Sequence, residues 1–272
     1  MRTEKLKTST GAEDHYIFMD ASEIVGVVEA NPRHYSDGGD WYGETNAEFK
    51  QRVVTGDERL VAESEAFLSQ IEDQIPVSRG WRNVDDVVGA VPNVPAFLAG
   101  HPQHMRRREK RSKNNAPIAI YMDLTSSAGI GSKDVRKRGI VLLALARMLV
   151  EHRPVELWVG TSLSMRGGSA TVAWKIDTAP LDLARASYHI SSTAIARLFG
   201  YKTAQRQLGA GGGWPLNNYD RHCATAKQRL MAAGFHDVLY IPPIMLRDEL
   251  ISNPVAWLKR VMSEYVNVEE AA

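Results

Sequence analysis

Two sets of basic residues and one polar loop are the parts of this chain whose residue types and spacing could do chemistry. The first set lies just before an apolar segment and consists of Arg106, Arg107, Arg108, Lys110, Arg111 and Lys113. Each phosphate that such a residue neutralises releases condensed counterions, so the set predicts salt-dependent binding of nucleic acid without sequence readout. Arginine also stacks on exposed bases, which favours single strands. The alternative is a solvated hinge, or a strip that pairs with the acidic segment at residues 40–74.

A second set of bases begins the long helix that we expect after the apolar segment. It consists of Lys133, Arg136, Lys137 and Arg138. The two sets border one expected strand at its opposite ends, so we expect a groove over the edge of that strand to join them. Later, the Gly-rich segment "GAGGGW" ends in Trp214. It predicts a binding loop whose indole stacks on a base, with a disordered connector as the alternative.

The polar loop follows the apolar segment "APIAIYMDL" and has the pattern D-x-T-x-S, formed by Asp123, Thr125 and Ser127. The apolar segment is typical of a buried parallel strand, and ligands bind open α/β sheets beyond the carboxyl ends of such strands. Three oxygen ligands at alternating positions can converge on one hard cation such as Mg²⁺. In the alternative interpretation Thr125 and Ser127 cap the loop and the helix, and Asp123 accepts hydrogen bonds from backbone N–H groups.

Strand and helix patterns alternate around this loop. We expect a helix with Ser132 as its N-cap, two strands joined by a turn at residues 165–168, helices on both sides of the Gly-rich segment, a strand that ends at Pro242-Pro243, and a closing helix. This alternation predicts an α/β fold with a doubly wound, mostly parallel sheet.

The first 104 residues predict an irregular α+β half with an acidic helix. Residues 1–14 predict a loose polar segment, and residues 45–75 predict helix with a break at Thr55-Gly56. The segment "VVGAVPNVPAFLAGHPQ" contains three prolines and predicts an extended, partly buried connector. We therefore divide the chain into an N-terminal region at 1–104, a basic connector at 105–115 and an α/β domain at 116–268.

The D-x-T-x-S loop and the order of elements around it resemble the von Willebrand factor A domains, over residues 116–266. The resemblance implies a degenerate metal-ion-dependent adhesion site, because Trp214 stands where the family has a Thr and Pro242-Pro243 where it has an Asp. Asp177 and Asp248 are the carboxylates that could substitute. The resemblance also implies a protein-interaction module, dependent on Mg²⁺ or metal-free, which an AAA+ ATPase could partner.

The chain as a whole resembles uncharacterised proteins of bacteriophages and their hosts, on its Trp-containing N-terminal half and its "VPNVPAFLAGHP" segment. That resemblance implies an accessory role in phage transcription or replication, in which the protein recruits a polymerase.

Composition limits the classes of function. A formal net charge of +1 excludes a chain-wide basic field, so affinity for nucleic acid must come from local clusters. The single cysteine, Cys223, excludes an intrachain disulfide and a Cys-rich zinc site and is typical of a reducing compartment. No apolar window is long enough for a signal peptide or a membrane span, so we expect a cytoplasmic protein without a membrane partner.

No residue pattern predicts an enzyme, because no nucleophile has a base at a suitable spacing and no zinc-binding spacing of histidines occurs. We therefore expect a non-enzymatic nucleic-acid-binding protein that prefers single-stranded DNA. Its footprint is the two basic sets and Trp214. It needs no cofactor, and Mg²⁺ at the D-x-T-x-S loop is the one candidate.

Overall fold

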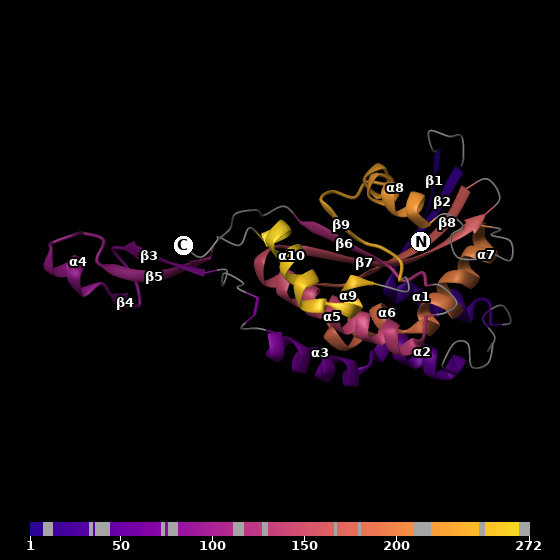
Figure 1. Ribbon diagram of the computed structural model, residues 1–272, viewed down its shortest axis with the longest axis horizontal. Coiled ribbons are helices and arrows are strands. Elements are labelled where there is room, and N and C mark those ends of the chain that lie inside the picture. Colours follow the sequence, from indigo (N-terminus) through magenta and orange to yellow (C-terminus); the bar gives the residue numbers. More distant parts are fainter. Residues whose placement is uncertain are drawn as a thin grey trace.

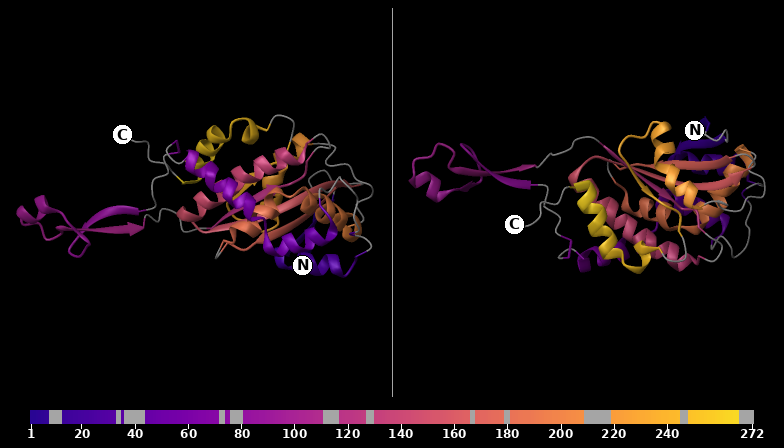
Figure 2. Two further views of the ribbon diagram at one scale, coloured as in Figure 1. Left: turned by 90° about the horizontal axis from the view of Figure 1, so that it is seen from below. Right: turned by 45° about the horizontal axis from the view of Figure 1, so that its top comes forward.

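The protein contains one large mixed sheet with helices on both faces and, apart from it, one small sheet (Figures 1 and 2). The computed structural model describes residues 1–7, 13–32, 35, 44–71, 74–75, 81–110, 117–126, 130–165, 168–178, 181–208, 219–244 and 248–266. None of the described helices is both long enough and apolar enough to cross a bilayer.

The large sheet has six strands in the order β1-β2-β8-β7-β6-β9. The strands are β1 (Arg2–Lys7), β2 (Glu13–Asp20), β6 (Ile118–Asp123), β7 (Val155–Met165), β8 (Gly168–Ile176) and β9 (Val238–Ile241). The pairs β2–β8, β6–β7 and β6–β9 are parallel, and the pairs β1–β2 and β7–β8 are antiparallel. The expected mixed α/β fold with a mostly parallel sheet is therefore confirmed.

Helices cover both faces of this sheet. They are α1 (Ile24–Glu29), α2 (Asn46–Thr55), α3 (Glu58–Ile71), α5 (Ser132–His152), α6 (Leu183–Ser191), a π-helix (Ile195–Tyr201), α7 (Lys202–Leu208), α8 (Tyr219–Ala232), α9 (Glu249–Ser252) and α10 (Pro254–Val266). β6 is buried along its whole length, with Ile118, Ile120 and Met122 in the core under α5 and Ala119 and Tyr121 in the core under α8. This two-sided burial is why its sequence is a continuous apolar run.

The N-terminal half shares the core of the large sheet. β1 pairs with β2 over residues 2–7, so this part of the polar segment expected to be loose is a strand. β2 in turn pairs with β8, more than 150 residues away in the sequence. α2 packs on α6, and α3 packs on both α5 and α6. The boundary that we expected after residue 104 therefore does not divide the sheet or its core.

Two predictions about helix ends can be compared with the structure in detail. The break at Thr55-Gly56 is confirmed, since α2 ends at Thr55 and Gly56 has a φ of 78°. The N-cap of α5 is Gly131, one residue earlier than expected, and Ser132 is the first helical residue.

Residues 81–110 form the small sheet, which we call the arm. It contains β3 (Trp81–Asp86), β4 (Val91–Pro92), α4 (Val94–Leu98) and β5 (Met105–Lys110), with strand order β3-β5-β4 and antiparallel pairing. The arm projects from the rest of the molecule, with α4 and β4 at its far end (Figure 1). The expected basic connector at 105–115 is therefore a strand over Met105–Lys110. Its backbone groups form hydrogen bonds by pairing with β3, although its sequence has no apolar pattern that would predict a strand.

Candidate nucleic-acid interface

The first basic set lies on the central strand of the arm. Arg106 is the cross-strand neighbour of Asp85, and its Nε donates to Asp85 Oδ1 at 3.3 Å. Arg107 Nε donates to a carboxylate oxygen of Asp86. The Arg107 side chain and the backbone N–H of Val87 lower the pKa of Asp86, which therefore stays ionised at neutral pH. Asp85 and Asp86, which bind Arg106 and Arg107, lie on the arm itself and not in the acidic segment expected to mask this set.

Both of these ion pairs are exposed to solvent, with 49% of the Arg106 side chain and 45% of the Arg107 side chain accessible. Exposed pairs of this kind contribute only about 0 to 1 kcal/mol, so a phosphate can compete for either guanidinium. Over its described range the arm has five basic and three acidic residues, a formal charge of +2. The arm is therefore positively charged, although less so than residues 106–113 alone.

The rest of the first set is described only in part. In the backbone register Arg108 lies opposite Asn83, and Lys110 lies opposite Trp81. The side chains of Arg108 and Lys110 lie outside the described part of the structure. Arg111 and Lys113 lie wholly outside it.

The far end of the arm exposes apolar side chains that the sequence did not predict to be exposed. Six of the nine exposed large apolar residues of the described chain are on the arm, namely Val87, Val88, Val91, Val94, Phe97 and Leu98. Phe97 is 61% exposed, and its ring meets the His104 ring edge-on at 5.2 Å. Apolar side chains grouped in this way on a surface mark an interaction site.

The expectation that this segment is partly buried is therefore wrong. Its valines and prolines are typical of a connector that packs on a core. The sequence signal that could have indicated an exposed segment is the helix start Asn-Val-Pro. The Asn93 side chain accepts a hydrogen bond from the Ala96 N–H and caps α4. Such a segment is held by hydrogen bonds between its own residues and does not have to pack on the main core.

The second basic set lies elsewhere and is divided between surface and interior. Lys133 and Lys137 are exposed, whereas Arg136 makes a two-nitrogen ion pair with Glu63 of α3. Arg138 is 1% exposed and cannot reach a nucleic acid. β6 pairs with β7 on one side and with β9 on the other, so it has no free edge over which the expected groove could join the two sets.

Asp123 lies fully buried at the carboxyl end of β6. Its Oδ1 accepts from the Thr125 N–H at 2.9 Å, and its Oδ2 accepts from the hydroxyls of Ser162 at 3.2 Å and Tyr240 at 3.4 Å. The Thr125 hydroxyl donates to the Ser162 carbonyl at 3.2 Å and accepts from the Ser162 N–H at 2.8 Å. Both side chains therefore tie the loop to β7, which agrees with the alternative interpretation for Asp123.

The guanidinium of Arg138 closes the same edge of the sheet. Its Nη1 donates to the Asp123 carbonyl at 3.0 Å, its Nη2 donates to the Pro242 carbonyl after β9, and its Nε lies 3.4 Å from an Asp248 carboxylate oxygen. The segments after β6 and β9 also pair directly, since the Ile244 N–H donates to the Thr125 carbonyl at 3.0 Å. A buried cationic side chain thus occupies the place between two strand ends where we expected an open crevice.

The described donors at this edge do not fit a magnesium ion. The Thr125 hydroxyl is used by β7, and Asp248 caps α9 by accepting from the Leu250 N–H at 3.0 Å. Asp177 follows β8, which runs antiparallel to β7, so it lies at the opposite edge of the sheet from Asp123. Within the described residues no three His, Cys, Asp or Glu side chains are grouped to hold a metal.

Two tyrosines at this edge stay protonated. Burial, followed by the charge of Asp123, raises the pKa of Tyr201 to about 12 and that of Tyr121 well above its ordinary value. Neither phenol can therefore act as a general base near neutral pH. The remaining predicted site residues, Ser127 and Trp214, lie outside the described residues.

Comparison with known proteins gives one family. The model of a family described as "Domain of unknown function (DUF7192)" matches residues 7–259. The matched range extends from the end of β1 into α10 and includes the whole arm. No curated protein and no solved structure matches the chain.

Proposed function

Because the chain belongs to the DUF7192 family, a domain of unknown function, we propose a function from the geometry of its arm: the protein binds single-stranded nucleic acid, DNA in preference, and does so without catalysis. The observation that carries this proposal is the combination of exposed arginines along β5 with an exposed aromatic and apolar group at the end of the same narrow sheet.

Each part of the arm has a known use in binding nucleic acid. Arginine side chains along a strand contact phosphates and position the arm, and they do so without reading sequence. An exposed ring such as Phe97 stacks on an unpaired base, at about 1 to 3 kcal/mol for each base stacked. Apolar groups at the tip of an arm also insert between base steps, but in a duplex this requires unstacking. A single strand avoids that cost, which is why we propose it as the preferred ligand.

A fluorescence-anisotropy titration tests this proposal with single-stranded and double-stranded oligonucleotides at two salt concentrations. We expect wild-type affinity for the single strand to fall as salt rises. Changing both Arg106 and Arg107 to Ala should weaken binding and reduce the salt slope by about 0.7 for each phosphate that is no longer neutralised. Phe97→Ala should weaken binding by about 5- to 150-fold with an unchanged salt slope.

The matched control is Arg147→Ala combined with Arg260→Ala, which removes the same charge from two exposed ion pairs outside the arm. This control should bind the single strand like the wild type. If the arginine pair and Phe97 can both be replaced without loss of affinity, or if the control loses as much as the arm variants, the arm is not the interface.

A protein-interaction module is the second candidate, and the apolar tip of the arm favours it. We infer that such a module would be metal-free, because Asp123 and Thr125 are bonded within the protein. The order β6, polar loop, α5, the β7–β8 pair, helices, β9 and α10 is the order on which the resemblance to von Willebrand factor A domains rests. Recruitment of a phage polymerase, or of an AAA+ ATPase, would belong to this candidate. It predicts that Phe97→Ala abolishes capture of the partner and leaves oligonucleotide affinity unchanged.

A further inference from the structure

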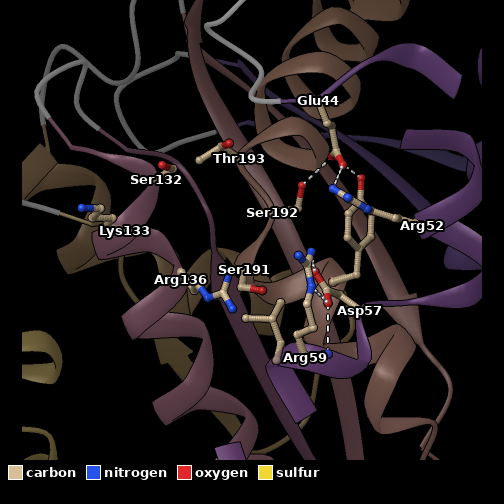
Figure 3. A pocket seen from close by; sticks show the side chains of 12 residues that line it. Glu44, Arg52, Asp57, Arg59, Ser132, Lys133, Arg136, Ser191, Ser192 and Thr193 are labelled. Carbon is tan, nitrogen blue, oxygen red and sulfur yellow. Dashed lines mark hydrogen bonds and ion pairs between the residues drawn. The ribbon is translucent and has the colours of Figure 1, made fainter. Parts of the chain in front are cut away.

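A cavity of about 240 Å³ lies between α2, α3, the first turns of α5 and the end of α6 (Figure 3). Its lining has more basic than acidic side chains, namely Arg52, Arg59, Lys133 and Arg136 against Glu44 and Asp57. Sites for drug-sized ligands have volumes of about 300 to 1,000 Å³, so this cavity suits a small ion or a compact metabolite. None of its residues belongs to the arm.

Two arginines of this cavity each keep one nitrogen available. Arg59 uses Nε and Nη2 to bind Asp57 at 3.1 and 2.9 Å, and Arg136 uses the same two nitrogens to bind Glu63. Nη1 of each has no bond to another described residue. Each carboxylate binds one side of a planar guanidinium group, which leaves the Nη1 side for a ligand.

The two guanidinium groups lie close enough to affect each other. Glu63 raises the pKa of Arg136, and the positive charge of Arg59 acts in the opposite direction. In Figure 3 the two side chains lie on either side of Ser191. An anion placed between them would be attracted by both and would offset their repulsion.

The amino end of α5 adds to this positive field. α5 has 21 residues, and its N-cap is Gly131, which has no side chain to accept from the first N–H groups. Such helix ends favour anions, because the N–H groups and the helix dipole both point at the ligand. Lys133, in the first turn of α5, is exposed and has no ion pair with another described residue.

We propose that this cavity binds the phosphate group of a small phosphorylated compound, with Arg59 and Arg136 bridging the phosphate and Lys133 and the amino end of α5 adding charge. A phosphate has enough oxygens to meet all of these donors at once, whereas a carboxylate has two. The hydroxyls of Ser132, Ser191 and Thr193 line the same cavity and provide hydrogen-bonding groups for a polyol or sugar attached to the phosphate.

Isothermal titration calorimetry of the full chain tests this site, with inorganic phosphate and ribose 5-phosphate as probes at constant ionic strength. We expect Arg59→Gln and Arg136→Gln each to weaken phosphate binding by about tenfold or more. Ribose 5-phosphate should bind more tightly than phosphate. The matched control is Arg147→Gln, because Arg147 makes an exposed ion pair with Glu65 on the same two helices, with 42% of its side chain accessible against 40% for Arg136.

The control should keep the affinity of the wild type within about twofold, and thermal unfolding of each variant verifies that it is folded. The proposal is overturned if the wild type shows no saturable phosphate binding below about 10 mM, or if Arg147→Gln loses as much affinity as Arg136→Gln. An oligonucleotide with a 5′-phosphate that binds more tightly than its 5′-hydroxyl form, in an Arg136-dependent manner, would assign the phosphate to a nucleic-acid end and overturn the small-molecule assignment. The arm variants test the proposed function separately, since they leave this cavity intact.

Discussion

Burial decides the protonation state of single residues in this protein, and His189 is the clearest case. The side chain lies fully buried in α6, and its Nε2 is 3.2 Å from the Val53 carbonyl of α2. Removing the imidazolium from water lowers the pKa of His189 to about 3, with Arg185 acting in the same direction and Asp182 in the opposite one. His189 is therefore neutral at physiological pH and donates to α2 as an uncharged side chain.

This depressed pKa predicts a specific loss of stability in acid. Below pH 6.5 the unfolded chain binds a proton at His189 that the folded chain does not, so stability falls as pH falls from 6.5 toward 3, by about 1.4 kcal/mol per pH unit. His189→Gln, which can still donate to Val53, should lack this contribution. Urea unfolding of both proteins between pH 7 and pH 5 measures the difference. Parallel stability curves for the two proteins would show that His189 is not the titrating group.

Arg138 is one of the side chains that join elements at the carboxyl edge of the sheet. It reaches from α5 to the ends of β6 and β9 and to the first turn of α9. A guanidinium can serve three acceptors in different directions, which the point charge of a lysine cannot do. Open α/β sheets bind ligands at this edge, but in this protein the buried side chain of Arg138 occupies it.

Replacing Arg138 should therefore destabilise the fold strongly. We expect Arg138→Met to lower the free energy of unfolding by about 3 to 5 kcal/mol, because it leaves the buried partners of the guanidinium unsatisfied. Arg138→Lys should recover little of this loss. Arg147→Met in the same helix is the control, and it should cost less than about 1 kcal/mol because its pair with Glu65 is exposed. Equal costs for the two methionine variants in urea unfolding would contradict the structural role of Arg138.

In the molecule as a whole, the arm and the large sheet have separate structural roles. The hydrophobic clusters of the described chain contain no residue of the arm. The arm is held instead by the backbone pairing of its own three strands. It can therefore present an apolar tip to solvent without opening the main core.

Deletion of the arm tests this separation. Replacing residues 81–110 by a Gly-Ser linker should leave the large sheet folded, with a change in Tm of less than about 4 °C, because no arm side chain belongs to the core. Oligonucleotide binding should disappear in the same variant, while phosphate binding in the cavity of Figure 3 should be kept. Calorimetry measures the Tm and the phosphate binding, and fluorescence anisotropy measures the oligonucleotide binding. A collapse of the Tm would show that the arm supports the core.

Elements whose signals are local could be predicted from the amino-acid sequence alone. The apolar run of β6, the turn between β7 and β8 and the break at Gly56 all depend on residues within a few positions of each other. The sequence also located the first basic set, of which Arg106, Arg107, Arg108 and Lys110 lie on β5. It did so because charge density is a property of composition and needs no knowledge of the fold.

Which of these elements share a core, and which side chains reach solvent, was decided by the three-dimensional fold. β2 joins the sheet through β8, Arg138 is buried while Lys137 beside it is exposed, and Phe97 and Leu98 face water. A periodic pattern reports that one side of an element is apolar, but not which distant element covers that side. Strand pairing across more than 150 residues, and the burial that follows from it, depend on long-range interactions that no local pattern encodes.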